Sequence, residues 1–302
     1  MKRAIKWISF LILLLIIALV AAPFFIPLDS VKKIAGEKIK EMTGRDLIIA
    51  GEIKASMWPD IGVKLQQVTL SNPEGFSTKN MADIGDVTVE VALMPLLHGE
   101  VQIKQFIIDK PIINLEVNKK GVANWEFAPQ KKEGNQDGSA EQETATSAKK
   151  PASVLPVLGK IKIKNGDFTY KDLSTGKNYN ASNVDLDIKM PSFDSPLDVS
   201  AKLIFNKEQI NLSFHSEQPS KLAQGEDSGA KADIKIGSLL ALAFDGKASK
   251  QGANGNIDLN ISSLVALSGF AGKKMDWKGD TNLAFSQQGS IACSASECSL
   301  SK

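Results

Sequence analysis

The sequence predicts an antiparallel β protein with few helices, carried behind an N-terminal membrane anchor. Three observations lead to this fold class. An uncharged apolar stretch near the N-terminus is long enough to cross a bilayer, the residues from Leu47 onward alternate between apolar and polar, and turn sequences such as "SNPEG", "DKP" and "NKKG" separate the alternating runs. We therefore expect a sheet with one apolar face and one polar face.

The composition is that of a folded protein without a strong overall charge. The chain has 302 residues, of which 43% are hydrophobic, and this is enough for one large domain or two modest ones. Its 36 basic and 34 acidic residues leave a net charge of +2. This balance argues against nucleic acid as a partner.

Residues 7–28, "WISFLILLLIIALVAAPFFIPL", form the charge-free apolar stretch, and Lys2, Arg3 and Lys6 precede it. In a helix that rises ~1.5 Å per residue, such a stretch crosses a bilayer core of ~30 Å. The leading positive charges favour a cytoplasmic N-terminus. We predict a cytoplasmic tip and transmembrane anchor over residues 1–28. A cleaved secretory signal is the alternative, less favoured because the apolar run continues beyond "LVAAP", and either reading exports the remainder.

Residues 29–44, "DSVKKIAGEKIKEMTG", are expected to form a short amphipathic helix. Asp29 or Ser30 can cap its start, and Gly44 is a suitable stop. The apolar positions fall on one stripe and lysines cover the other side. Two roles stay open for this helix: it rests on the membrane surface or plugs the mouth of the sheet, or it is an ordinary packing helix.

Two stretches, 45–127 and 154–302, carry the alternating runs and are expected to form the first and second parts of the sheet. In "VTVEVAL", Thr88 and Glu90 lie on the face opposite the apolar residues. The comparable apolar runs are Val87, Val89, Val91, Leu93; Ile113, Leu115, Val117; Val184, Leu186, Ile188, Met190; Leu197, Val199, Ala201, Leu203, Phe205; Ile210, Leu212, Phe214; and Ile257, Leu259, Ile261.

The apolar parity changes at three points, each marked by polar or small residues: Gln66-Gln67, Lys104-Gln105 and Asn165-Gly166. Around the first point, Val63 and Leu65 have one parity, whereas Val68 and Leu70 have the other. A β-bulge restores the inward face after such a step and bends the strand, so we predict a bulge at each point. Chance alternation is the competing explanation, and weak internal repetition is favoured over it.

Residues 128–153, "APQKKEGNQDGSAEQETATSAKKPAS", are predicted to be a flexible insertion. The segment has no aromatic and no large aliphatic residue, so it cannot bury enough apolar area to offset the entropy lost on ordering. It either divides two domains or hangs as a loop from one continuous sheet. The alternation is similar on both sides, which favours the loop.

The sequence offers no evident catalytic or metal site. His98 and His215 are the only histidines, and neither has the spacing of a metal ligand. The carboxylates are scattered along polar strand faces, and the glycine-rich stretch 252–258 is typical of a hairpin turn. We therefore expect no enzyme activity, no cofactor and no metal.

The N-terminal region resembles that of bacterial AsmA family proteins. The motifs that carry the resemblance are Thr43-Gly44-Arg45, Gly51, Trp58-Pro59, Asn72-Pro73 with Gly75-Phe76, Pro95-Leu96-Leu97 with Gly99, Pro111, and Gly121 followed by Asn124-Trp125. Later stretches, "KIKIKNGDFTYKD" and "GSIACSASECSL", also look similar to the family. The resemblance is fairly specific for the motifs taken together and covers nearly the whole chain.

The resemblance implies a single-pass protein of the cell inner membrane, with most of the chain in the periplasm. It implies a curved antiparallel β-groove of the bridge-like lipid-transfer type, and a role in phospholipid traffic and outer-membrane homeostasis. The implied partners are phospholipid, the inner membrane, and outer-membrane components or another envelope protein. The candidate groove-lining residues are Val63, Leu65, Val68, Leu70, Val87, Val89, Val91, Leu93, Val184, Leu186, Ile188, Val199, Leu203 and Phe205.

Two alternatives accompany this prediction. A closed sandwich would cover the apolar face with a second sheet instead of lipid. An interaction scaffold would use exposed sheet edges to assist outer-membrane protein assembly.

The family generally has longer chains, so the second part of the groove is expected to be truncated at the C-terminus. In an oxidising periplasm Cys293 and Cys298 are expected to form a disulfide, with two free thiols as the alternative.

Overall fold

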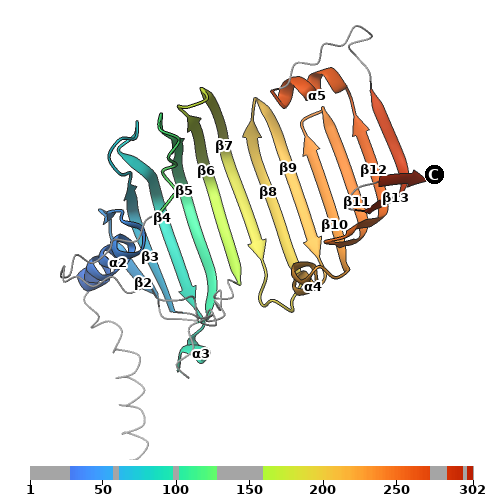
Figure 1. The fold of residues 1–302 in the computed structure, drawn as a ribbon. Helices are drawn as coiled ribbons and strands as arrows, with labels where there is room; N and C mark the ends of the chain where they lie inside the picture. Colours follow the sequence, from blue (N-terminus) through green and yellow to red (C-terminus); the bar gives the residue numbers. More distant parts are fainter. Residues whose placement is uncertain are drawn as a thin grey trace, which may run out of the picture.

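The structure is a computed structural model that describes residues 28–56, 61–97, 102–127, 159–272, 284–294 and 298–301 (Figure 1). The predicted anchor over residues 7–28 and the predicted insertion over residues 128–153 therefore lie almost entirely outside the described residues. Within the described ranges, no helix is long and apolar enough to cross a membrane. The first described element is α2 (Leu28–Thr43), at the place of the predicted amphipathic helix.

The protein is mainly β, and its strands form one open, curved sheet of fourteen strands (Figure 1). From β3 onward the strands lie side by side in chain order, while β1 and β2 both pair with the outer edge of β3. The strands are β1 (Leu47–Ile49), β2 (Ile53–Ser56), β3 (Ile61–Ser71), β4 (Asn80–Val91), β5 (Ile103–Val117), β6 (Lys160–Asp172), β7 (Lys177–Lys189), β8 (Leu197–Phe205), β9 (Glu208–Ser216), β10 (Ser228–Ile236), β11 (Leu240–Ser249), β12 (Gly252–Ile261), β13 (Phe285–Ser294) and β14 (Cys298–Ser301).

One strand pair corrects the antiparallel prediction. β5 and β6 are parallel neighbours, with Ile108 opposite Ile163 and Val117 opposite Asp172. A parallel pair needs a crossover that returns the chain to the starting end of the first strand, and residues 118–159 make this connection. β5 and β6 are neighbours, so the strands before and after the predicted insertion belong to one continuous sheet.

A transverse line of irregular backbone crosses the long strands β3 to β7. Four non-glycine residues in these strands have positive φ, namely Gln67 (53°), Lys110 (51°), Asn165 (50°) and Asn183 (51°). The strand register places them at neighbouring positions. From the pairs that flank them, Gln67 of β3 lies opposite Gly85 of β4, Gly85 lies opposite Lys110 of β5, and Lys110 lies beside Asn165 of β6. We call this line the crease.

The predicted bulges have different outcomes. At Lys104 and at Asn165 the strand register shifts by one residue, which confirms both bulges. Around Gln67 the register between β3 and β4 is unbroken, so the prediction of a bulge in this strand pair is wrong. The apolar face is nevertheless preserved, because the positive φ of Gln67 changes the parity and lets Val63, Leu65 and Val68 pack in one cluster.

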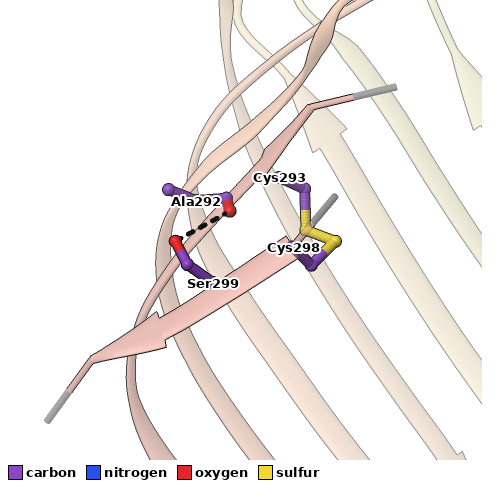
Figure 2. The surroundings of a disulfide bond; sticks show 4 residues. All are labelled: Ala292, Cys293, Cys298 and Ser299. Carbon is purple, nitrogen blue, oxygen red and sulfur yellow. Dashed lines mark hydrogen bonds between the residues drawn. A yellow bond between two sulfur atoms is a disulfide. The ribbon is translucent and has the colours of Figure 1, made fainter. Parts of the chain in front are cut away.

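Three short helices and a disulfide complete the fold. The helices α3 (Leu93–Leu97) and α4 (Pro219–Gln224) lie at one end of the strands, and α5 (Leu264–Phe270) lies at the other end (Figure 1). Cys293 and Cys298 are paired in a disulfide across the β13–β14 hairpin, where they are also register partners (Figure 2). Beside it, the Ser299 hydroxyl donates to the Ala292 carbonyl at 3.3 Å.

Candidate functional site: the apolar face of the sheet

Directly paired residues in a sheet point to the same side, so the strand register shows how far an apolar face extends. One row of such pairs runs through ten strands, from β3 to β12, without a polar residue. We call it the apolar row; its members are Leu65, Val87, Ile108, Ile163, Leu186, Ala201, Leu212, Ile234, Leu242 and Leu259. At ~4.8 Å between strands, the row is about 45 Å long.

A second row runs parallel to the apolar row, two residues away along each strand. Its members are Val63, Val89, Phe106, Ile161, Ile188, Val199, Phe214, Ala232, Phe244 and Ile257. Both rows end at β13, where Gln287 lies opposite Leu259 and Gly289 lies opposite Ile257. The apolar face is therefore a continuous band from β3 to β12.

The opposite face of the sheet is polar and carries ion pairs between neighbouring strands. Lys162 pairs with Asp187 at 2.7 Å, and Lys231 pairs with Asp245 at 2.8 Å. The hydrogen bond to Asp187 raises the pKa of Lys162, so this lysine keeps its charge at all physiological pH values. These hydrated charges keep one side of the sheet in water and leave the other side as the candidate binding surface.

The two ends of the apolar face differ in how they are covered. Near the N-terminus, Ile49, Ile53, Val68 and Val87 form a buried cluster, and Ala35 of α2 packs against it. The half-buried residues around this cluster include Leu47, Val63, Leu65, Ile84, Val89 and Phe106. From β8 to β12 the residues of both rows are half-buried at most, so the apolar face is open there.

Most predicted groove-lining residues lie on the apolar face, but three need correction. Val68 and Val87 are 4% and 8% exposed, because α2, β1 and β2 place a small protein core over them, so they are not open to a ligand. Leu93 does not lie on the sheet, since β4 ends at Val91 and Leu93 begins α3. The other predicted residues are half-buried strand residues, namely Val63, Leu65, Leu70, Val89, Val91, Val184, Leu186, Ile188, Val199, Leu203 and Phe205.

A buried polar network lies at the N-terminal corner of the sheet, and its members were not predicted from the sequence. The Asn124 side chain is fully buried and makes three hydrogen bonds, which use both of its N–H donors and its oxygen as an acceptor. Its oxygen accepts from the Glu116 backbone N–H at 3.0 Å, and its nitrogen donates to the Asn72 side chain at 2.9 Å and to the Asn114 carbonyl at 2.7 Å. This one amide therefore ties three segments together.

Two charged residues extend the network. Glu116 is 2% exposed, and its carboxylate accepts hydrogen bonds from the backbone N–H and the hydroxyl of Ser77. Arg45 is 7% exposed and donates to the carbonyls of Asn124 at 3.0 Å and Glu126 at 3.3 Å. Burial lowers the pKa of Arg45, although a guanidinium stays charged at neutral pH.

This corner joins motifs that are far apart in the sequence. Arg45 belongs to "TGR", Asn72 to "NPEGF" and Asn124 to "NW", and all three stretches also carried the family resemblance. Their residues hold α2, the 72–79 loop and the end of β5 together. We therefore interpret them as residues that stabilise the N-terminal end of the sheet, and not as a catalytic group.

The described residues do not assemble a reactive site elsewhere. Within the parts of the chain that the structure describes, no three His, Cys, Asp or Glu side chains are placed to hold a metal ion. His215 contacts Asp198 at 2.8 Å, but both side chains are well exposed on the polar face. His98 lies outside the described residues.

The fold and the site define a protein with an open sheet that has one apolar face, covered by a small core near the N-terminus and open from β8 to β12. Comparison with family models identifies the group more closely: the AsmA family model matches residues 1–290, and the chain belongs to this family. No curated protein and no solved structure is significantly similar to the chain. The family resemblance seen in the sequence is thus confirmed.

Proposed function

We propose that this protein binds the acyl chains of phospholipids on its apolar face and transfers lipid between membranes of the cell envelope. The observation that supports this most directly is the continuous pairing of apolar residues from β3 to β12, whose members on β8–β12 are only half-buried. Membership of the AsmA family is consistent with a role in envelope lipid transport or homeostasis. Binding of this kind needs no catalytic residue and no cofactor.

The energetics of the open face favour an apolar ligand. Leaving a leucine- or phenylalanine-sized side chain in water instead of burying it costs about 1.5–3 kcal/mol. Large exposed apolar patches therefore mark interaction sites. Acyl chains suit a long band without specific polar groups, because they need apolar contact and make no directional bonds.

The proposal places the apolar N-terminal stretch in the inner membrane and the sheet in the periplasm. The charge-free run over residues 7–28 and the basic residues before it support this orientation. The disulfide between Cys293 and Cys298 supports an oxidising compartment for the sheet. A sheet on the periplasmic side would receive lipid from the membrane in which the chain is anchored.

Site-specific crosslinking tests the proposal. A photoreactive amino acid at position 212 or 242, in the apolar row, should crosslink to phospholipid in intact cells. Position 213, the neighbour of Leu212 on the polar face, is the matched control and should give few adducts. Lipid mass spectrometry of the full-length protein should also find co-purified phospholipid. A folded protein without lipid and without adducts at positions 212 and 242 would exclude the proposal.

A scaffold for outer-membrane protein assembly is a second candidate, and one observation favours it. On its inner edge β13 pairs with β12 along its whole length, but on its outer edge β14 pairs only with Ser290–Cys293. Among the described residues, the outer edge of Phe285–Gly289 therefore has no partner strand. Such an edge can accept an added strand. Crosslinks from position 287 to unfolded barrel proteins, without lipid adducts at position 212, would favour this function over lipid transfer.

A further inference from the structure

A row of neighbouring aromatic side chains borders the apolar face along one side. The ring centroids lie 6.0 Å apart for Trp125 and Tyr170, 6.0 Å for Tyr170 and Tyr179, 6.2 Å for Tyr179 and Phe205, and 5.7 Å for Phe205 and Phe270. The row includes both tyrosines of the chain. These five residues come from the 118–127 segment, β6, β7, β8 and α5, and we call them the aromatic rim.

The register places the aromatic rim on the apolar face. Tyr170 is paired with Leu115 and with Tyr179, and Phe205 is paired with Ala181 and follows Leu203 two residues along β8. All of these positions lie at the strand ends where β5 and β6 finish. The last ring, that of Phe270, is held there because the Asn206 side chain donates to the Phe270 carbonyl at 2.9 Å.

The turns beside the aromatic rim are basic. Within residues 118–122, 171–177 and 206–208 there are five lysines and two acids, a net charge of +3; the lysines are Lys119, Lys120, Lys171, Lys177 and Lys207. The turns at the opposite strand ends, residues 190–196, 217–227 and 250–251, have a net charge of −2; their charged residues are Asp194, Glu217, Lys221, Glu226, Asp227 and Lys250. The two rims of the apolar face therefore differ in charge, and both tyrosines lie at the basic rim, whereas Phe193 lies in the 190–196 turn of the opposite rim.

We propose that bound lipids lie along the strands with their phosphate headgroups at the aromatic rim. This inference rests on the proposed function and adds an orientation to it. Tyrosine and tryptophan favour places where an apolar medium meets water, and lysine side chains bind phosphate as point charges. The ligand class is therefore a glycerophospholipid whose anionic phosphate meets the Lys119, Lys177 and Lys207 side.

The dimensions of the sheet agree with this orientation. One leaflet of a bilayer core is about 15 Å deep, half of the ~30 Å core, and a strand advances ~3.3 Å per residue. An acyl chain that starts at Phe205 would thus reach about five residues along β8. It would contact Leu203 and Ala201, and Ala201 belongs to the apolar row. The acidic opposite rim would contact neither the phosphate nor the start of the chain.

Two photoreactive phospholipid probes test the orientation on the full-length protein in membranes. Both are phosphatidylglycerol analogues, whose headgroups carry a net negative charge; one carries a diazirine on the headgroup, and the other carries it near the end of an acyl chain. We expect headgroup adducts within residues 118–122, 171–177 and 206–208 at least fivefold more often than within residues 190–196 and 250–251. The acyl probe should label residues around Leu212 and Leu242.

The possible outcomes distinguish a failure of the proposed lipid orientation from a failure of the proposed lipid-binding function. Headgroup adducts that are equal on both rims, or more frequent on the acidic rim, would overturn the orientation, while acyl adducts at the apolar row would leave the proposed function intact. If neither probe labels the apolar face, the proposed function itself fails, and the orientation fails with it.

A pair of variants provides the second test. Because each lysine near an anionic lipid surface contributes ~1 kcal/mol, or about fivefold in binding, the double variant Lys177→Ser, Lys207→Ser should lose headgroup adducts at the aromatic rim by at least fivefold. The matched control Lys221→Ser, Lys250→Ser removes two lysines from the opposite rim and should keep its adducts. All four side chains are exposed, so both variants should fold. An equal loss in both variants, or no loss in the first, would overturn the proposal.

Discussion

The two halves of the sheet carry the same alternation of apolar and polar residues but use it differently. The strands β3 to β7 are 11 to 15 residues long, cross the crease, and at their outer end pack under α2 into a small core. The strands β8 to β12 are nine or ten residues long, contain no non-glycine residue with positive φ, and leave their apolar side open. An apolar face predicts burial, but it does not tell whether protein or ligand buries it.

This comparison predicts where the free energy of unfolding is concentrated. The N-terminal half has buried side chains and a buried polar network, whereas the C-terminal half depends mainly on strand pairing. Substitutions in the first half should therefore destabilise the protein, and comparable substitutions in the second half should affect ligand binding instead.

The largest effect is expected for Asn124→Ala. The substitution leaves the Glu116 N–H and the Asn114 carbonyl without their partner in a buried place, and each such group costs about 1–3 kcal/mol, so the total should be about 4 kcal/mol. Urea unfolding of the full-length protein in detergent, followed by tryptophan fluorescence, measures the loss. The control Asn180→Ala removes an exposed amide from β7 and should change the stability by less than ~0.5 kcal/mol. Equal effects of the two variants would contradict the contrast between the halves.

A smaller effect is expected for a pair of valines that are chemically identical but differently covered. Val68→Ala should cost about 2 kcal/mol, because it removes two buried methyl groups and leaves a cavity under α2. Val199→Ala, on the open face, should cost less than ~1 kcal/mol in the lipid-free protein, since water already reaches this side chain. The same urea unfolding assay compares the two variants. If Val199→Ala were the more destabilising variant without lipid, a protein element would have to cover β8.

The strands and their apolar faces could be predicted from the sequence. The parallel strand pair and the covered part of the apolar face could not, because they depend on contacts between residues far apart in the chain. The alternating runs predicted strands and faces, since side chains in a strand alternate regardless of their neighbours. The parallel pairing of β5 with β6 was missed because it depends on where the chain returns after residues 118–159. Val68 was assigned to the open face for a similar reason: the alternation does not show that α2 folds back over it.

The candidate site, too, could be predicted only in part: its apolar residues were predicted, but the aromatic rim and the polar network were not. Leu186, Val199 and Leu203 were correctly placed on the apolar face by periodicity alone. The aromatic rim and the Asn124 network were not detected, because their members are separated by tens of residues and meet only through the register. One signal for the network was present: the three stretches that supply it were the same ones that resemble the family.

The crease offers a third test, because two aspartates stabilise its bulges reciprocally. The Asp185 carboxylate accepts from the Asn165 N–H at 2.9 Å, and the Asp167 carboxylate accepts from the Asn183 N–H at 3.3 Å. Each bulge leaves a backbone donor without a ladder partner, so Asp185→Ala should cost about 1 kcal/mol. Hydrogen exchange at Asn165 should accelerate in this variant, whereas Asp194→Ala, in the β7–β8 loop, should leave it unchanged. Unaltered exchange at Asn165 would show that the crease does not need the carboxylate.

The smallest expected effect concerns Asp172, in the β6–β7 turn beside the aromatic rim. Hydrogen bonds from Ser174 and Thr175 lower the pKa of this carboxyl to about 2. Because the pKa is lower in the folded protein than the ordinary value of about 3.9, the stabilisation is present above pH ~4 and is lost as the pH falls through about 2. Carboxyl NMR titration measures the pKa directly, and hydrogen exchange of Ser174 and Thr175 should rise over the same pH range. If Asp172 titrated near pH 4, the turn that presents Lys177 would not be ordered by this carboxylate, and the aromatic rim would be looser than the structure shows.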